Sequence, residues 1–482
     1  MKKLIKNGII VSAMDEYTAD ILIEGEKISQ IGMNIQEKAD EVIDASGMYV
    51  LPGGVDQHTH FLFGVPHEDT SGNSTPDLVG KTLDYTYTAL IGGTTTIVDY
   101  TSNQPDMGML ETLDFKKNKC AKDIICCDYS MHANFTSLDD SVFEELKKLP
   151  ENGIATIKLY MAYKPTCYYV DDYYMFKFME LCRDCGITVY LHAENADMLN
   201  YLRDKAYAEG KLSPKYHIDT RPPYLEMEAV TRGITFAKAA RCPICIVHVT
   251  CMEAVDQIKK ARNEGAAVVG ETCTHYLMMD RSCVDEGEFL EVSKHVCAPA
   301  FRTKKHPPYL WKSLRRDWLS IVASDHSPTK LVDKARGKDD FRLIPNGSPG
   351  VNDRLQMLWT YGVEKGNMTR SRLVDVYATT PAKMLGIFPQ KGAIEIGSDA
   401  DIVLYDPSWK GVVSNEDTPT GIDYDVFEGM EQIGRVETVF LRGKKVVENH
   451  KYTGKQGDGR FIPAKPYGLA YSLLEEDWRF EE

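Results

Sequence analysis

Histidines, one lysine and one aspartate follow apolar runs at intervals along this sequence of 482 residues. The stretch PGGVDQHTH at 52–60 ends in two histidines, whose side chains point to the same side of a strand because side chains alternate with a period of two. The candidate metal ligands are His58, His60, Lys158, His192, His248 and Asp325. Imidazoles with a carboxylate suit a borderline divalent ion such as zinc. Six groups are too many for one tetrahedral ion, so they favour two.

Each of these residues also has a structural alternative. The pair His58 and His60 fits an ordinary polar strand end, and a single buried histidine such as His192 or His248 fits a hydrogen-bonded core residue. Asp325, in ASDHSP, could cap the turn that follows it. The metal interpretation is preferred because five separate strands would have to carry such residues by chance.

Lys158 is the least expected member of the set. It lies in ATIKLYMAY, where burial of an unpaired cation costs several kcal/mol, unless the side chain reaches solvent at the strand end. A buried lysine with a lowered pKa can be neutral and nucleophilic. Reaction with CO2 would turn it into a carbamate, an anion able to bridge two metal ions. The sequence therefore favours Lys158 as an N6-carboxylysine.

The elements that must position these residues alternate between apolar strands and amphipathic helices. Helical patterns cover 140–149, 174–186 and 252–265, the last ending at Gly265. With the segment that ends in HTH as the first strand, eight strands are expected, the others at 94–102, 123–132, 155–163, 188–195, 245–250, 266–277 and 319–328. This pattern predicts an α/β fold, a (β/α)8 TIM-type barrel, whose active site lies at the C-terminal ends of its strands.

Short alternating strands at both ends of the chain predict a small β-sandwich domain built from both termini. The expected division is a β-sandwich part at 1–53, a hydrolase barrel at 54–388 and a second β-sandwich part at 389–450. The tail at 451–482 is expected to pack on another domain or subunit.

Composition excludes several classes of partner. The formal net charge of -15 disfavours nucleic acid and anionic membranes, because phosphate binding needs a basic surface. No stretch approaches the ~18 apolar residues of a membrane span. The N-terminal MKKLIKNGII is interpreted as a strand and not as a signal peptide, so a cytoplasmic location is expected.

The twelve cysteines are expected to be reduced and mostly buried. Two CxxC pairs, Cys182/Cys185 and Cys242/Cys245, raise the alternative of a structural zinc site. That alternative is disfavoured because the first pair lies in a helix-to-glycine turn and the second runs directly into a strand.

As a set, the motifs resemble those of the amidohydrolase superfamily and, within it, the dihydropyrimidinase/hydantoinase family. The matching stretches lie between residues 52 and 403 and read PGGVDQHTH, GGTTTIVDY, IKLYMAY, LHAEN, IVHVT, GETCTHYL, ASDHSP, PNGSPGV and GSDADIV. The resemblance implies that one metal binds His58, His60, Lys158 and Asp325, and that the other binds Lys158, His192 and His248. Zinc is the expected metal.

The resemblance also implies a reaction, the opening of a dihydropyrimidine or hydantoin ring to an N-carbamoyl amino acid. A hydroxide that bridges the metals would attack the ring carbonyl, with Asp325 as proton shuttle and Tyr163 as oxyanion donor. Tyr163 could instead be a plain apolar ring in a tyrosine-rich stretch. Ala298 and Asn346 would hold the ring amide through backbone groups, and the assembly would be a homotetramer or a homodimer.

This chain departs from the family pattern in two places. CAPAFR puts Ala298 where relatives have serine, and the stretch after His60 carries His67, Glu68 and Asp69 where relatives have a mostly apolar substrate-gating loop. That acidic loop predicts either a polar substituent on the substrate or a solvated surface.

Three other functions remain to be weighed against this one. They are an allantoinase-like ureide hydrolase, a non-catalytic dihydropyrimidinase-like assembly protein, and a redox or structural-zinc role of the CxxC pairs. A dihydroorotase is disfavoured because Phe61 and Phe63 stand where an arginine would clasp the substrate carboxylate.

Overall fold

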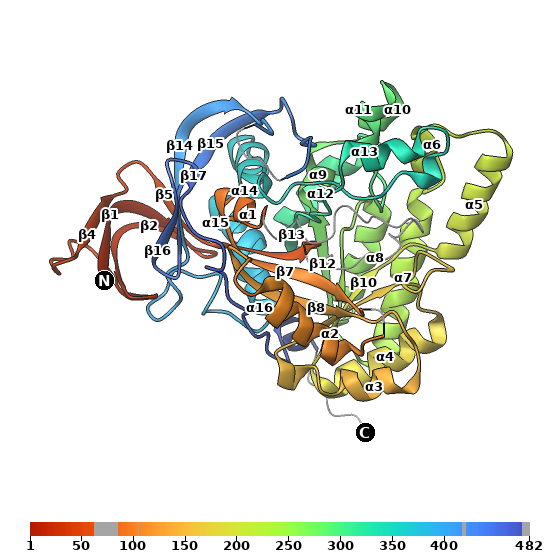
Figure 1. Cartoon of the computed structure of the whole chain (residues 1–482), viewed down its shortest axis with the longest axis horizontal. Helices are drawn as coiled ribbons and strands as arrows, with labels where there is room; N and C mark the ends of the chain where they lie inside the picture. Colours follow the sequence, from red (N-terminus) through yellow and green to blue (C-terminus); the bar gives the residue numbers. More distant parts are fainter. Residues whose placement is uncertain (62–84, 105, 417–420, 475–482) are drawn as a thin grey trace.

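The computed structural model describes residues 1–61, 85–104, 106–416 and 421–474 (Figure 1). His67, Glu68 and Asp69, which the sequence singled out as a departure from the family, lie outside the described residues.

In these ranges, eight parallel strands follow one another around a barrel in chain order. They are β6 (Gly54–Thr59), β7 (Thr94–Ser102), β8 (Asp128–Asn134), β9 (Thr156–Tyr160), β10 (Thr188–His192), β11 (Ile244–Ile246), β12 (Val268–Cys273) and β13 (Ile321–Ala323). A parallel bridge between Thr59 and His326 joins the last strand region to the first, and the His60 N–H donates to the His326 carbonyl at 2.9 Å. The predicted (β/α)8 barrel is confirmed.

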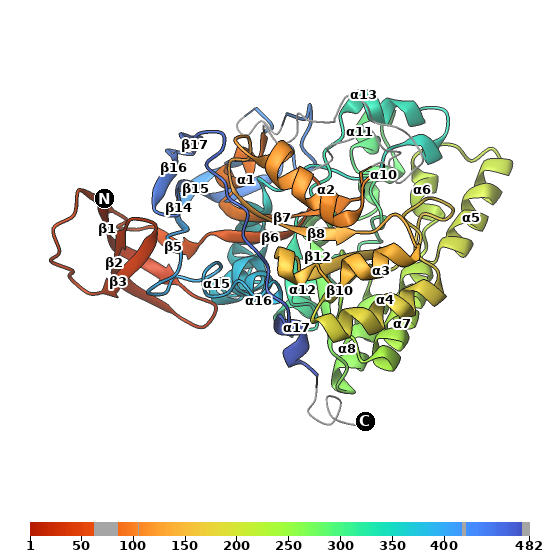
Figure 2. The same ribbon diagram turned by 60° about the horizontal axis from the view of Figure 1, so that its bottom comes forward.

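Helices cover the outside of the barrel, as Figures 1 and 2 show for α3, α4, α7 and α8. The longer ones are α2 (Met109–Phe115), α3 (Asp140–Leu146), α4 (Asp172–Cys185), α5 (Ala196–Ala208), α7 (Pro223–Ala240), α8 (Met252–Asn263) and α12 (His306–Arg315). In α4 the Asp171 side chain caps the N-terminus by accepting from the Tyr174 N–H, and Gly186 ends the helix in the left-handed region at φ 71°. Searched over the described ranges, the structure has no helix with the length and hydropathy to cross a membrane.

Shorter helices fill the connections. They are α1 (Tyr87–Ile91), α6 (Lys215–Asp219), α9 (Thr274–Met278), α10 (Ser282–Asp285), α11 (Phe289–Ser293), α13 (Leu331–Lys334), α14 (Arg354–Met357), α15 (Arg370–Val374), α16 (Thr380–Met384) and α17 (Leu469–Ser472).

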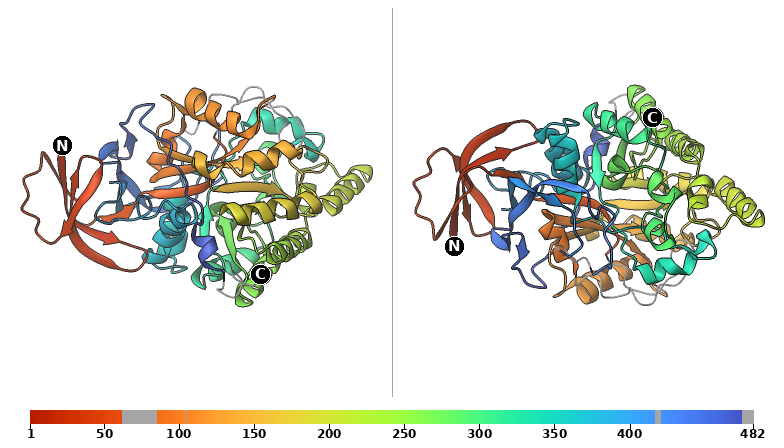
Figure 3. Two further views of the ribbon diagram at one scale, coloured as in Figure 1. Left: turned by 90° about the horizontal axis from the view of Figure 1, so that it is seen from below. Right: turned by 90° about the horizontal axis from the view of Figure 1, so that it is seen from above.

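A separate, mostly antiparallel sheet comes from both ends of the chain, as predicted, and lies to one side of the barrel (Figure 3). Its described strands are β1 (Lys2–Val11), β2 (Glu16–Glu24), β3 (Lys27–Gly32), β4 (Glu41–Asp44), β5 (Tyr49–Pro52), β14 (Ile402–Val412), β15 (Glu431–Leu441), β16 (Lys444–Glu448) and β17 (Lys451–Tyr452). Strand β5 unites the two ends, because it pairs parallel with β1 and antiparallel with β14.

The Pro-Gly-Gly turn carries the chain from this sheet into the barrel. The predicted first strand is in fact two strands, β5 in the terminal sheet and β6 in the barrel. A Cβ atom at Gly53 would lie 2.1 Å from the Thr95 side chain, and one at Gly54 would lie 2.2 Å from the Tyr377 ring. Glycine is needed at both positions because these two side chains pack directly against the backbone there.

Among the other predicted strands, only the one at 94–102 has the limits of the observed strand. Several stop earlier than expected: β9 ends at Tyr160, β10 at His192, β11 at Ile246 and β13 at Ala323. The strand expected at 266–277 stops at Cys273 and continues as α9, and the one expected at 123–132 begins only at Asp128. A barrel strand stops at the rim, although the apolar pattern continues into buried segments that cover it.

The described part of the tail packs on the barrel. The Ile462, Ala464 and Tyr467 N–H groups donate to the carbonyls of Tyr129, Gly153 and Gly186, at 2.7, 2.8 and 2.8 Å. These acceptors lie at or near the N-terminal ends of β8, β9 and β10, so the tail covers the end of the barrel away from the ligand-bearing strand ends. A subunit contact through this tail stays a prediction, as do the domain limits.

Candidate metal centre

His58 on β6, His60 just after that strand and an aspartate beyond β13 meet at the C-terminal end of the barrel. Asp325 Oδ1 lies 3.2 Å from His58 Nε2 and 3.3 Å from His60 Nε2. In the part of the chain that the structure describes, this is the one group of three or more His, Cys, Asp or Glu side chains close enough to hold an ion. Asp325 adopts φ 50°, a left-handed conformation of the kind that clusters at functional sites.

His192 and His248 adjoin this group. Their rings lie 4.4 Å apart, centre to centre, and the His248 ring lies 5.3 Å from the His58 ring. His248 also has a left-handed backbone, at φ 40°, and its buried Nδ1 has no hydrogen-bond partner among the described residues. The structure therefore brings all four predicted histidines and Asp325 together.

Lys158 lies on β9 with 1% of its surface exposed. Its Nζ is 4.5 Å from the centre of the Tyr100 ring and 5.3 Å from that of Tyr160. Within the described ranges, no carboxylate lies within 4 Å of this amine. Burial lowers the pKa of Lys158 to about 8, although Asp325 and Glu271 oppose the shift. The alternative that the Lys158 side chain reaches solvent at the strand end is wrong, since the side chain is buried.

Ionisation favours metal binding by the same residues. Burial disfavours the charged form of Asp325, but the neighbouring imidazoles outweigh it and hold the pKa of that carboxyl well below its usual range. Burial lowers the pKa of His60 to about 4 and that of His248 well below its usual value. At neutral pH these residues are a carboxylate and neutral imidazoles, the forms that bind a metal ion.

Carboxylates behind the histidines orient them. Glu271 on β12 accepts from His58 Nδ1 at 2.7 Å, and Glu194 after β10 pairs with His192 Nε2 at 2.9 Å. In each imidazole the other nitrogen is left for a ligand at the centre. This arrangement fixes the tautomer and raises the basicity of a metal-binding histidine.

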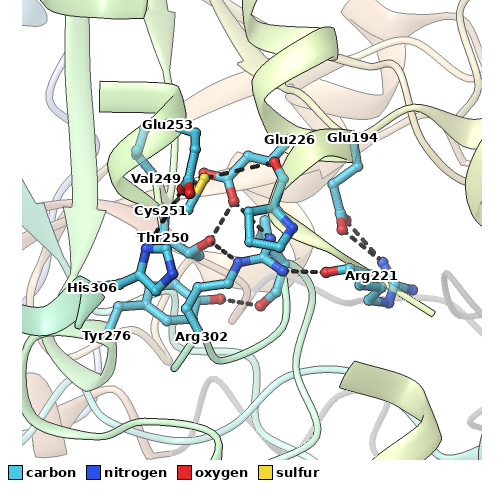
Figure 4. A network of polar contacts seen from close by, with 12 residues as sticks. Glu194, Arg221, Glu226, Val249, Thr250, Cys251, Glu253, Tyr276, Arg302 and His306 are labelled. Atoms are coloured by element: carbon cyan, nitrogen blue, oxygen red, sulfur yellow. Dashed lines mark hydrogen bonds and ion pairs between the residues drawn. The ribbon is translucent and has the colours of Figure 1, made fainter. Parts of the chain in front are cut away.

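A buried polar network supports Glu194 (Figure 4). Arg221 Nη1 donates to both Glu194 oxygens, at 3.0 and 2.9 Å, and the Arg302 guanidinium donates to the Arg221 carbonyl. Arg302 also donates to Glu226 at 2.8 Å and to Thr250, two residues after His248, at 2.7 Å. The Arg302 guanidinium thus links the segment that carries His248 to Arg221, whose side chain holds Glu194 behind His192.

Glu194, Glu271 and Arg221 were not predicted as site residues. Glu194 lies in the motif LHAEN and Glu271 in GETCTHYL. A carboxylate inside an apolar strand pattern is the sequence signal that could have identified both, because a buried charge needs a partner. Nothing in the sequence pattern pointed to Arg221, which approaches the site from a connection between helices.

Of the predicted substrate contacts, Tyr163 adjoins this centre. The Tyr163 ring is 5.1 Å from the His192 ring, and its backbone is left-handed at φ 66°. Ala298 is buried, and Asn346 Oδ1 is a buried acceptor without a partner in the described chain.

His132 also lies in the barrel lumen, but both of its ring nitrogens are paired within the protein. Nδ1 lies 2.6 Å from the Thr156 hydroxyl and Nε2 lies 2.8 Å from the Gln57 carbonyl. It is a hydrogen-bonded core histidine.

All twelve cysteines lie among the described residues; no disulfide joins them there, and most of them are buried, as predicted. No group of described residues joins the CxxC cysteines into a site for a metal ion.

The donors fit a divalent metal centre. An ionised Asp325, imidazoles whose tautomers are fixed by hydrogen bonds and a buried His248 nitrogen without a partner in the described chain are what such an ion requires. The sequence from residue 49 to residue 446 matches the profile of the amidohydrolase family. The chain belongs to that family.

Curated relatives of this amidohydrolase cover nearly its whole length. It is 40% identical to a D-hydantoinase of Geobacillus stearothermophilus over 97% of this chain and 98% of that one. It is 35% identical to a dihydropyrimidinase of Rattus norvegicus over 96% and 89% of the two chains. The predicted membership in the dihydropyrimidinase/hydantoinase family is confirmed, and with it the prediction of a hydrolase.

Solved structures agree. A dihydropyrimidinase from Brevibacillus agri superimposes with a TM-score of 0.92 at 39% identity, over 97% of this chain and all of that one. An L-hydantoinase from Arthrobacter aurescens gives a TM-score of 0.86 at 28% identity, over 96% and 99% of the chains.

Proposed function

We propose that this amidohydrolase opens a hydantoin or dihydropyrimidine ring by hydrolysis of a ring amide bond and releases an N-carbamoyl amino acid. The observation that carries the proposal is the cluster of His58, His60 and Asp325, with Lys158, His192 and His248 beside it. The named activities of the relatives support the same class of substrate.

Two divalent ions, with zinc expected, would be held by His58, His60, Lys158 and Asp325 and by Lys158, His192 and His248. Lys158 would be carboxylated, which supplies the bridging anion that the described residues around it do not provide. When bound, such a pair acidifies water and polarises a carbonyl.

The side chains would divide the remaining work. Asp325 would accept a proton from the attacking water and return it to the ring nitrogen as the C–N bond breaks and the new C–O bond forms. The Tyr163 hydroxyl would donate to the carbonyl oxygen as negative charge develops there, a contribution of about 3 kcal/mol. Backbone groups at Ala298 and Asn346 would hold the ring amide.

Metal analysis and a substrate panel test the proposal. We expect about two metal equivalents per chain, and activity on hydantoin or dihydrouracil that Lys158→Ala abolishes together with metal binding. Lys177→Ala is the matched control, because Lys177 lies on the outer helix α4, where it pairs with exposed Asp140 and lies over the Phe143 ring. Full activity and two metals in Lys158→Ala would refute the mechanism.

The same experiment separates the alternatives. Preference for allantoin in the panel would indicate a ureide hydrolase, and absence of metal and of turnover would indicate an assembly protein. The homotetramer that the resemblance implies would be tested by light scattering.

A further inference from the structure

A cleft beside Tyr163 contains a cation that forms no ion pair with the residues that the structure describes. The cleft has a volume of about 390 Å³, and its lining includes Tyr163, Lys164, Arg203, Asp204 and Arg342. Three of these side chains are basic and one is acidic. Their pairing therefore decides which charge a bound molecule would meet.

Two of the three cations are already paired. Lys164 Nζ lies 2.9 Å from Asp197, and Arg342 donates to both oxygens of Asp340, at 3.0 and 2.8 Å. The Arg342 guanidinium also stacks 3.5 Å from the centre of the Tyr207 ring, so it is fixed in place. The acid of the cleft, Asp204, lies 3.9 Å from Arg342, at the limit of an ion pair.

Arg203 is different. Over the residues that the structure describes, it forms neither a hydrogen bond nor an ion pair. Burial and the nearby cations Arg221 and Arg342 lower its pKa to about 10, although Asp204 and Asp340 oppose the shift. The guanidinium therefore stays charged at neutral pH, with no carboxylate bound directly to it among the described residues. Such a group favours an incoming anion, because a carboxylate pairs with guanidinium through two parallel hydrogen bonds.

Arg203 also lies beside the site where the substrate ring is expected. It also lines a narrow cavity together with Arg221 and Asn346, whose buried Oδ1 has no partner in the described chain. The Asn200 side chain, on the same helix, donates to the Lys164 carbonyl at 2.8 Å and so ties α5 to the segment after Tyr163. Arg203 therefore stands between the predicted ring-holding residue and the open cleft.

We propose that Arg203 is a specificity residue that binds a carboxylate on the exocyclic substituent of the substrate ring. The inference rests on the proposed ring-opening function and names its substrate class, a cyclic ureide with an acidic side arm. Hydrolysis would then give an N-carbamoyl derivative of an acidic amino acid. Arg203 would not touch the reacting carbonyl, so its effect should appear in KM and not in kcat.

Two isosteric substrates test this inference. We expect the protein to favour a hydantoin with a carboxyethyl group at ring carbon 5 over its carbamoylethyl analogue by about tenfold in kcat/KM, a typical gain for one charge-assisted pair. Arg203→Gln should remove the preference through KM and leave unsubstituted hydantoin unaffected. Lys205→Gln, which removes the same charge from an exposed position of the same helix, should keep the preference.

Binding measured by calorimetry separates this inference from the proposed function. If the rings are opened but the two analogues react equally, or if Arg203→Gln keeps the preference, Arg203 does not bind the substituent. If no ring is opened but the carboxylated hydantoin binds wild type more tightly than Arg203→Gln, the proposed function fails and the anion site stands. Arg203→Lys, which keeps the charge, should retain part of the preference and guards against a folding defect in the glutamine variant.

Discussion

Two buried lysines have opposite surroundings in this barrel. Lys158 and Lys391 are each 1% exposed. Lys391 Nζ lies within 2.5, 3.0 and 2.7 Å of Asp128, Asp399 and Asp401, whereas Lys158 faces tyrosine rings and no carboxylate lies within 4 Å in the described chain. Burial opposes the charge of both, but the three acids outweigh it at Lys391 and raise the pKa of that amine.

The difference shows that partners, and not burial, set the charge of an interior amine. Lys391 is a permanent cation that joins Asp128 at the start of β8 to the segment leading into the terminal sheet. Lys158 is left without an ion pair among the described residues, a costly state unless the amine loses its proton or reacts. The first arrangement serves structure, and the second suits a group that is to be modified.

Carboxylates are present near Lys158, but they serve histidines. Glu271 and Asp325 each bind imidazoles, so neither forms an ion pair with the lysine. Around Lys391 the same residue type neutralises the cation directly. The contrast can be tested by removing one member at a time.

The largest effect is expected from Lys391→Met. This change leaves Asp128, Asp399 and Asp401 buried without their cation, and breaking a buried ion pair costs about 3–5 kcal/mol. Urea unfolding at pH 7 would measure the loss. Lys27→Met is the matched control, because exposed Lys27 also pairs with Asp399 and should cost less than about 1 kcal/mol. Equal losses in the two variants would contradict the comparison.

A smaller effect is expected from Glu271→Gln, which neutralises the acid behind His58. Glu271 also accepts from Gln57 at 2.7 Å and from the His248 N–H at 3.2 Å, so its charge supports two candidate ligands. Loss of such a partner lowers metal affinity or activity by about 10–100-fold. Metal titration and turnover would measure it, with Glu180→Gln at an exposed position of α4 as the control. Unchanged metal affinity would show that Glu271 is only a packing residue.

The fold was predictable because its signals are local. Apolar runs ending in His58, His192 and His248 identify parallel strands and their C-terminal ends, and alternation in the terminal segments identifies the second sheet. The strand limits were not predictable, since the residues after Cys273 are buried whether the chain is strand or helix.

The site was predictable only in the residues that the strands themselves carry. Arg221 reaches Glu194 from the segment between α6 and α7, and Arg203 faces its cleft from α5, so their roles depend on how distant segments fold together. Lys391 shows most clearly which contacts could not be predicted from the sequence. Its sequence neighbours Asp399 and Asp401 are visible in GSDADIV, but Asp128 is more than two hundred residues away.

At Lys158, unlike Lys391, we expect that removal of the amine raises the free energy of unfolding. In protein freed of metal, Lys158→Met replaces an amine that has no acidic partner among the described residues with an apolar chain of similar length. The folded state should gain about 1–2 kcal/mol, because the desolvation cost disappears and no described ion pair is lost. Urea unfolding of metal-free wild type and variant at pH 7 would measure the change. A loss as large as that of Lys391→Met would mean that Lys158 is charged and paired.

The smallest effect concerns alkaline pH and Lys391. Its folded pKa is raised above the ordinary value of 10.5, so its contribution to stability is complete below pH 10.5 and is lost as pH rises toward the folded pKa. Other groups titrate in the same range, so the useful quantity is the stability difference between wild type and Lys391→Met. That difference should shrink by about 1 kcal/mol between pH 9 and pH 11. A difference that stays constant over this range would mean that Lys391 keeps an ordinary pKa, and that its three acids do not distinguish it from Lys158.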